Sequence, residues 1–196
     1  LQDLFCGSEA RFKAVLDIKQ AILESDISVI VVPTPSGPDG VFCNRHVLDA
    51  CDSIGVGLGD KDNYHTVVLA STVMPGSTGG KIKQRLESAS GRIAGKDFGL
   101  CYVPAFVALG SVVRDFLNPD YVLIGESDVK SGDLLEELYS NVCENSPRIA
   151  RMNFVNAELT KLATNTYVST KITFGNMLAK FCELIPGAHV DTVTSA

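Results

Sequence analysis

Residues 27–38 read ISVIVVPTPSGP, and this stretch decides the fold class of the chain. Its first half, residues 27–32, is an apolar run of strand length rich in β-branched residues, and the Pro- and Gly-rich half ends it abruptly. A continuous apolar run predicts a strand buried on both faces. The next such run, TVVLA at residues 66–70, follows a helical pattern at residues 44–54. Strands that alternate with helices predict an α/β fold with a parallel sheet.

The same alternation continues on both sides of these runs. Asp17, followed three residues later by Gln20, is a capping-box pattern that opens a short helix. Pro75 is expected in the first turn of a helix that continues through Leu86. Further strands are predicted at residues 98–103, 121–124 and 147–150, with helices at residues 131–142 and 153–185, the last ended by Pro186 and Gly187.

Composition narrows the classes of function. With 45% hydrophobic residues among 196, the chain can form a substantial core, and its net charge of -6 argues against nucleic acid or an anionic membrane as the main partner. No apolar run approaches the length of a membrane span, and no signal peptide is visible. The chain begins at Leu1 rather than at a methionine, so we expect it to be a piece of a longer protein.

The cysteines and histidines are scattered along the chain. The six cysteines form no CxxC pair, which argues against a zinc or redox motif and favours free thiols in a reducing cytoplasm. The three histidines, His46, His65 and His189, form no ligand cluster, and we expect each at the surface or at a helix cap. The sequence therefore predicts a cytoplasmic protein without a metal site.

Two loops are candidates for ligand binding because each follows a predicted strand. Residues 32–36 and 71–73 combine proline with small hydroxyl residues, so a flat polar ligand could approach their backbone at the carboxyl edge of the sheet. The helix expected to start near Pro75 would offer free amide groups and a positive dipole end to a phosphate. Each loop on its own would be interpreted as an ordinary strand-to-helix turn.

The long helix at residues 153–185 carries Lys161 and Asn165 one turn apart, on the same face. The helix is apolar over much of its circumference, which predicts that it is buried. A buried lysine is costly unless it meets an anion or a network of acceptors, so a negatively charged ligand or intermediate is a reasonable partner. The alternative is a lysine that reaches solvent at the helix edge.

Several short motifs follow one another in a characteristic order: VPTP at residues 32–35, STVMPG at 71–76, PAF at 104–106, GS at 110–111, DFLNPD at 115–120, IG at 124–125, and ELTKL at 158–162 with Asn165. Together they resemble the UDP-glucose/GDP-mannose dehydrogenase family, whose members use NAD to oxidise C6 of a nucleotide sugar twice, from alcohol to carboxylate. The resemblance covers nearly the whole chain.

This resemblance implies a domain organisation. Residues 1–150 would be a Rossmann-like NAD-binding domain that lacks its first GxGxxG unit, and residues 151–196 a central helical domain that forms the family's dimer interface. The expected partners are a nucleotide sugar and a second copy of the chain. UDP-glucose is the expected sugar nucleotide because it is a common substrate in the family.

The resemblance also implies roles for individual residues. The NAD pocket would be lined by Val32, Pro33, Thr34, Pro35, Ser36, Ser71, Thr72, Val73 and Leu109. The substrate would contact Ala105, Phe106, Val107, Lys161 and Asn165. Lys161 and Asn165 would stabilise oxyanions at C6, and Thr72 would help to hold the catalytic water. An ammonium held ready in a dry site suits this task, because both oxidation steps leave charge on oxygen.

The chain departs from the family pattern at important positions. Ala105 stands where the family normally has a glutamate that acts as general acid and base in thioester hydrolysis, and Val103 stands where it has an asparagine. The pyrophosphate-binding GxGxxG segment and the glycine-rich segment with the nucleophilic cysteine are not among these 196 residues. Leu109 replaces a glutamate that is often, though not always, present in the family.

Three hypotheses about function follow from these matches and departures. In the first, the chain is a piece of a nucleotide-sugar 6-dehydrogenase and is inactive by itself. In the second, favoured by Ala105, it is a degenerate paralogue retained for dimerisation or ligand binding. In the third, it belongs to another Rossmann dehydrogenase with a central helix that acts on a different acid or alcohol.

Overall fold

The computed structural model describes residues 12–108 and 110–196. The chain forms two compact units, Leu1–Glu158 and Leu159–Ala196, which we call the first and the second unit. Strands and helices alternate through the described part of the first unit, which confirms the predicted α/β class. They are α2 (Ile18–Leu23), β1 (Ile27–Ile30), α3 (Arg45–Gly59), β2 (Thr66–Leu69), η1 (Thr78–Ile82), α4 (Lys83–Ser90), β3 (Gly99–Tyr102), α5 (Val112–Leu117), β4 (Tyr121–Glu126), α6 (Val129–Val142) and β5 (Arg148–Met152).

The strands form one sheet in the order β1-β2-β3-β4-β5. Every neighbouring pair is parallel except β3 and β4, which run antiparallel with Cys101 opposite Glu126. The predicted parallel sheet is therefore wrong for this one pair. The chain enters β4 at the same end of the sheet at which it left β3, and the short helix α5 replaces the long crossover helix that a parallel connection usually carries.

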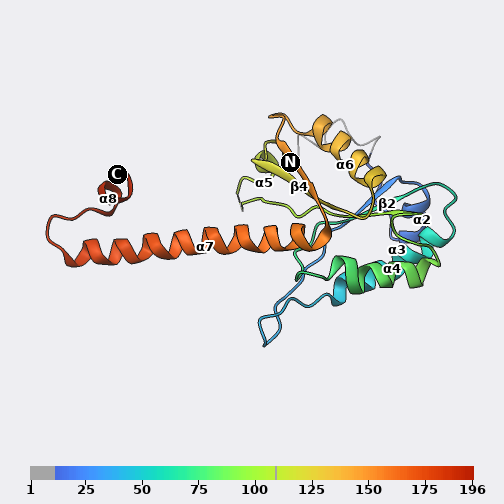
Figure 1. Cartoon of the computed structure of the whole chain (residues 1–196), viewed down its shortest axis with the longest axis horizontal. Coiled ribbons are helices and arrows are strands. Elements are labelled where there is room, and N and C mark those ends of the chain that lie inside the picture. Colours follow the sequence, from blue (N-terminus) through green and yellow to red (C-terminus); the bar gives the residue numbers. More distant parts are fainter. Residues whose placement is uncertain (1–11, 109) are drawn as a thin grey trace. The chain divides into compact units, whose positions relative to one another are not determined.

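Helices cover both faces of this sheet (Figure 1). Along β2, Val67 and Leu69 point into the core formed with α3 and α4, whereas Val68 points into the core formed with α6. Along β3, Leu100 and Tyr102 likewise join the first core and Cys101 the second. This alternation of strand side chains between two apolar layers is what makes both strands continuous apolar runs in the sequence.

Strand β1 does not meet the prediction that it is buried on both faces. Ile30 is buried in the core with α3, but Val29 on the opposite face is 58% exposed. β1 is an edge strand of the described sheet, and Val29 is not covered there by any described element as Val68 is covered by α6. A run of β-branched residues predicts a strand without revealing whether a second layer lies over it.

Helix α3 is longer than predicted because its glycines pack against neighbouring helices. The predicted end at Ile54 precedes Gly55, Gly57 and Gly59, yet the helix continues to Gly59. A β-carbon on Gly55 would lie 2.4 Å from the Ala89 Cβ, and one on Gly57 would lie 2.8 Å from Ile22 Cβ. Close packing against α4 and α2 therefore outweighs the low helix propensity of glycine.

The starts of two helices test the capping predictions. Asp17 caps α2 and accepts a hydrogen bond of 3.3 Å from the Gln20 amide, as predicted. Pro75 does not lie in the first turn of a helix, because residues 75–77 form a turn and η1 begins at Thr78. Gly80 has φ −97° and ψ −110°, so a distorted turn separates Pro75 from the regular helix α4.

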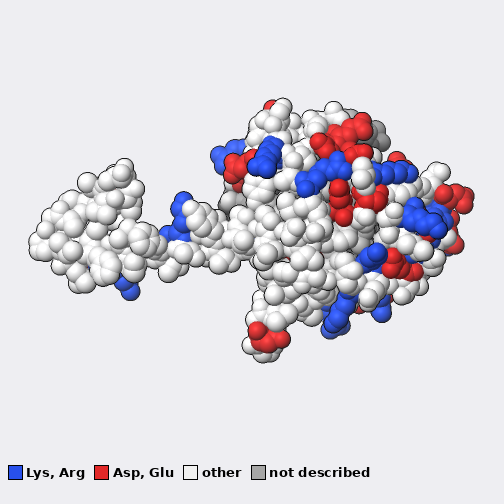
Figure 2. Space-filling view, in the orientation of Figure 1, with Lys and Arg blue, Asp and Glu red and all other residues white. Residues whose placement is uncertain are grey.

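Helix α7 (Phe154–Leu184) begins in the first unit and continues through the second, which also holds α8 (Val190–Thr194). The prediction that this helix is buried is wrong for most of its length, because its residues from 165 onward are largely exposed. Among its described residues, the second unit contains no other helix or strand besides this part of α7 and α8. Figure 2 shows charged side chains gathered on the first unit and few along α7. No helix in the described ranges is both long and apolar enough to span a bilayer.

Candidate functional site

The two predicted ligand loops are joined by side-chain hydrogen bonds at the carboxyl edge of β1 and β2. The Ser71 hydroxyl accepts from the Val32 amide at 2.9 Å and donates to the Val32 carbonyl at 2.7 Å. The Thr34 hydroxyl donates to the Thr72 carbonyl at 2.7 Å. Residues 32–34 and 71–72, which lie 38 or 39 positions apart in the sequence, thus form one hydrogen-bonded platform.

Residues of this platform differ in what they can offer a ligand. Pro33, Pro35 and Ser36 are exposed, whereas Val32, Thr34 and Thr72 are half-buried. Ser71 and Val73 are buried, with the Ser71 hydroxyl engaged by Val32 and the Val73 side chain in the core. Ser71 and Val73 can therefore hold the platform in shape but present little side-chain surface to a ligand.

The turn after the platform does not offer free amides to a phosphate, contrary to expectation. The Gly76 amide donates to Glu158 Oε2 at 2.5 Å, and the Thr78 amide donates to Glu158 Oε1 at 2.7 Å. Glu158 is fully buried in the first turns of α7. A carboxylate of the protein itself therefore occupies the place predicted for a ligand anion. Glu158 belongs to the ELTKL motif, but its contact with this turn was not predicted from the sequence. The one local sign of it is the presence of an acidic residue in a largely apolar helix.

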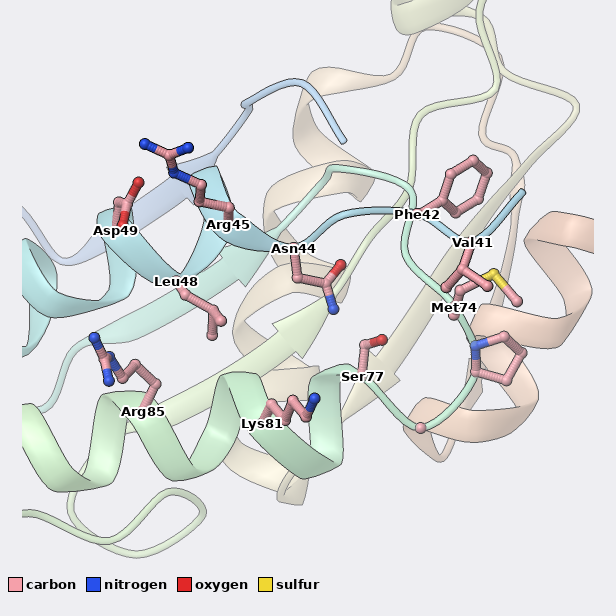
Figure 3. Close-up of a pocket in the computed structure, with 12 residues that line it drawn as sticks. Val41, Phe42, Asn44, Arg45, Leu48, Asp49, Met74, Ser77, Lys81 and Arg85 are labelled. Carbon is pink, nitrogen blue, oxygen red and sulfur yellow. The ribbon is translucent and has the colours of Figure 1, made fainter. Parts of the chain in front are cut away.

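A cavity of about 610 Å³ lies beside this turn (Figure 3). Figure 3 shows Asn44, Arg45 and Leu48 on the α3 side, and Lys81 and Arg85 on the side of η1 and α4. Arg85 is held by an exposed ion pair to Asp52. None of the residues named for the NAD pocket or for the substrate loop lines this cavity. Pro75, Gly76 and Ser77, at the helix start predicted to bind a phosphate, do line it.

Lys161 and Asn165 belong to the second unit and share a face of α7. The Lys161 side chain is only 7% exposed, so it is not the solvent-directed lysine of the alternative interpretation. Burial lowers the pKa of Lys161. Asn165, one turn later, is exposed. The helix thus presents a buried ammonium followed by an accessible carboxamide.

The predicted substrate loop follows β3 in the first unit. Ala105 and Val107 are exposed, and Phe106 between them is half-buried with its ring 4.8 Å from the Tyr121 ring. Phe106 therefore anchors the loop to β4 and leaves the neighbouring side chains accessible. Leu109 lies outside the residues that the structure describes.

The histidines and the cysteines that the structure describes provide no alternative site. Cys43, Cys51, Cys101, Cys143 and Cys182 are all free thiols, and burial raises the pKa of Cys51 and of Cys101 to about 12. His46 is exposed, and His189 is exposed at the N-cap position of α8 without a side-chain capping hydrogen bond. His65 is buried, which corrects its predicted surface position. Within residues 12–108 and 110–196 there is no group of three or more His, Cys, Asp or Glu residues arranged to hold a metal ion.

Comparisons with known proteins assign the chain to a family. Residues 3–143 match the model of the NAD-binding domain of the UDP-glucose/GDP-mannose dehydrogenase family, and residues 155–196 match the model of its central domain. The chain belongs to this family. NAD is accordingly the cofactor of the first domain.

Relatives with two different substrate names resemble the chain about equally. It is 35% identical over 175 residues to GDP-mannose 6-dehydrogenase of Pseudomonas aeruginosa, covering 89% of this chain and 39% of that relative. It is 33% identical over 176 residues to UDP-glucose 6-dehydrogenase of Haloferax volcanii, covering 89% of this chain and 41% of that relative. The chain thus spans about two fifths of the length of these relatives.

A solved structure confirms the fold. A crystal structure of GDP-mannose dehydrogenase from Pseudomonas aeruginosa, described as a ternary complex, superposes with a TM-score of 0.90 at 34% identity. The match covers 96% of this chain and 42% of that one. This chain therefore shares its Rossmann-like domain and the long helix after it with that structure.

The residues of the platform are suited to binding NAD, but the turn at residues 76–78 is not suited to binding its phosphates. Exposed Pro33, Pro35 and Ser36 leave the backbone accessible to a flat cofactor at the carboxyl ends of the strands. The amides of Gly76 and Thr78 are taken by Glu158, so they cannot hold the cofactor's phosphates.

Proposed function

We propose that this chain is part of an NAD-dependent nucleotide-sugar 6-dehydrogenase, which oxidises the C6 alcohol of its substrate to a carboxylate. The observation that carries the proposal is the burial of Lys161 in a family whose relatives act on nucleotide sugars. A buried ammonium suits chemistry in which negative charge develops on oxygen.

In this proposal the described residues divide the work. Residues 33–36, supported by Ser71 and Val73, would hold NAD, which would supply the hydride acceptor for each of the two oxidations. Lys161 and Asn165 stabilise the oxyanion at C6, and Thr72 positions the water that ends the reaction. Ala105, Phe106 and Val107 lie along the sugar nucleotide, with the Phe106 ring fixing the loop against Tyr121.

The nucleotide sugar is UDP-glucose or GDP-mannose. The sequence motifs favoured UDP-glucose only because it is common in the family. The similarity to a GDP-mannose enzyme is comparable, 35% against 33% identity, so both substrates belong in the test.

The second candidate is a catalytically degenerate protein that keeps dimerisation or ligand binding. The observation that favours it is Ala105, whose methyl group cannot relay a proton where the family normally has a glutamate. Under this alternative the complete protein would bind NAD without forming NADH.

The test is NADH formation by the complete protein that carries this chain, assayed with UDP-glucose and with GDP-mannose. We expect Lys161→Met to lower kcat about 10²- to 10³-fold, the usual loss for one group that stabilises an oxyanion. Lys180→Met, which removes an exposed lysine from the same helix, is the matched control and should leave kcat unchanged. Equal activity of the two variants would exclude the role given to Lys161.

The 196 residues by themselves should not reduce NAD, because the GxGxxG segment and the nucleophilic cysteine of the family are not among them. NADH formation by the purified 196-residue chain would contradict the proposal that pyrophosphate binding and the nucleophilic cysteine are needed for the reaction. We also propose a cytoplasmic location, supported by the free thiols of the described cysteines.

A two-fold homodimer through α7 completes the proposal. Tyr167, Phe174, Met177, Phe181 and Leu184 are all exposed in the single chain and, with Thr170, follow one another at alternating spacings of three and four residues. Such a stripe is the pattern by which helices pair in water.

A further inference from the structure

Glu158 is a buried acid for which the proposed reaction has no direct use. Its side chain is fully buried, and each of its two carboxylate oxygens accepts one main-chain hydrogen bond, from Gly76 and from Thr78. An ionised carboxylate is the side chain that can accept at both oxygens simultaneously. The two donors flank Ser77, so the carboxylate holds both ends of the turn at residues 76–78.

This turn is continuous with the cofactor platform. Residues 71–73 carry the Ser71 and Thr72 groups that bond to Val32 and Thr34, and residues 76–78 follow without any intervening element. Val73, between the two bonded segments, is fully buried in the core. The whole segment 71–78 is therefore fixed at three places: at the loop that follows β1, in the core and at Glu158.

The surroundings of Glu158 are also polar and enclosed. Tyr102 on β3 is fully buried, and its burial together with the nearby Glu158 charge raises the pKa of the Tyr102 hydroxyl. Thr78 is fully buried, so water cannot replace a lost carboxylate oxygen there, and the Thr78 amide would be left without an acceptor. Gly76 is exposed, so its amide would bond to water and that end of the turn would no longer be held.

We propose that Glu158 is a positioning residue that acts through segment 71–78: by binding the amides of Gly76 and Thr78 it holds Ser71 and Thr72 in the geometry that NAD requires. This inference rests on the proposed function. It assigns Glu158 no contact with cofactor or substrate. The two hydrogen bonds join parts of the first unit that are 80 and 82 residues apart in the sequence.

The test compares the wild-type complete protein with Glu158→Gln, Glu158→Asp and the control Glu137→Gln, which makes the same chemical change at an exposed position of α6. The first measurement is amide hydrogen exchange without ligands. In Glu158→Gln the side-chain amide nitrogen cannot accept from an N–H group, so exchange should accelerate at Gly76 and Thr78 and extend to residues 71–73. Strands β2 and β3 should keep their protection.

The second measurement separates positioning from a general loss of structure. In Glu158→Gln the KM for NAD should rise about ten- to a hundredfold, the loss expected for one charge-assisted hydrogen bond. The KM for the nucleotide sugar should stay within about twofold, because the residues assigned to its binding, Lys161 and Asn165 on α7 and residues 105–107, all lie outside segment 71–78. Glu158→Asp keeps the charge on a shorter side chain, so its KM for NAD should lie between those of the wild type and Glu158→Gln. If Glu158→Gln does not fold, Glu158→Asp is the variant that tests the inference.

Three outcomes would overturn the inference. One is faster exchange at Gly76 and Thr78 with an unchanged KM for NAD, and another is an equal rise of both KM values. A third is a Glu137→Gln variant that behaves like Glu158→Gln. If the wild-type protein neither binds NAD nor forms NADH, the proposed function itself fails, and that result is recognised before any variant is compared.

Discussion

His65 is a buried residue whose protonation bears on stability near neutral pH. Its ring lies 2.9 Å from the Ser25 carbonyl through Nδ1 and 2.8 Å from the Ser28 hydroxyl through Nε2, so the neutral ring can satisfy both contacts. Burial is the main cause that lowers the pKa of His65, and the nearby Lys61 charge adds to it, while the Ser25 carbonyl and Asp26 act in the opposite direction.

A lowered pKa in the folded state makes stability depend on pH. The unfolded histidine takes up a proton near pH 6.5, whereas the folded one does so only at lower pH, so unfolding is favoured as the pH falls below about 6.5. We expect the free energy of unfolding, measured with urea, to decrease between pH 7.5 and pH 5.5. His65→Asn keeps a donor for the Ser25 carbonyl and should flatten this dependence. If the stability of His65→Asn depended equally steeply on pH, the pH dependence would have to come from other titratable groups.

Ala105 is the residue at which the proposed chemistry is weakest. Its side chain is exposed beside the anchored Phe106 ring, so a larger side chain fits there without displacing the core. In the proposed reaction, oxidation to a cysteine-bound thioester would use Lys161, Asn165 and the family's nucleophilic cysteine, which is not among these 196 residues, and hydrolysis would lack its general base.

We therefore expect a burst of NADH followed by slow turnover in the complete protein. Loss of a general base usually costs about 10²- to 10⁴-fold, so Ala105→Glu should accelerate the slow phase by a factor in this range and leave the burst unchanged. Rapid-mixing absorbance of NADH measures both phases. Steady turnover without a burst, unaffected by the substitution, would mean that another group acts as the base.

Gly55 illustrates how packing controls an element. A β-carbon on Gly55 would lie 2.4 Å from the Ala89 Cβ, so α3 and α4 approach each other closely only because this residue has no side chain. We expect Gly55→Ala to destabilise the chain by about 1–3 kcal/mol in urea unfolding, since the clash exceeds the gain in helix propensity. Val56→Ala, at the next and exposed position of the same helix, should change stability by no more than about 0.5 kcal/mol.

Whether an element depends on local sequence or on packing against distant elements explains which elements could be predicted from the sequence. Strand runs such as residues 66–69 and the capped helix α2 follow from local patterns, and these predictions are confirmed. The extension of α3 through Gly57, the antiparallel entry into β4 and the exposure of Val29 depend on which distant element lies alongside. Local periodicity carries no information on such neighbours, so these features were missed.

The candidate site shows the same limit. The motifs marked both loops of the platform, and the hydrogen bonds of Ser71 and Thr34 explain why small hydroxyl residues follow the two strands. The contact of Glu158 with Gly76 was missed, because an acid 82 residues away in the sequence gives no local sign of the amides that it binds.

For the molecule as a whole, α7 raises the question of what covers its apolar side chains. Phe174, Met177 and Phe181 are 56%, 44% and 52% exposed in the single chain. Covering such a stripe removes apolar surface from water at about 25 cal/mol per Å². A second copy of the same helix provides a matching stripe, and two-fold pairing makes the contact closed, so a dimer of defined size is expected rather than open aggregation.

The expected result is a dimer at micromolar concentration in sedimentation equilibrium. Phe174→Glu places a charge in the middle of the stripe and should shift the chain to monomer, because a carboxylate buried between two helices would have no partner there. Val129→Glu introduces the same charge at an exposed valine at the start of α6 and should leave the dimer intact. If wild type is monomeric, or if both variants dissociate equally, the proposed α7 interface is wrong. Another surface would then have to account for any association.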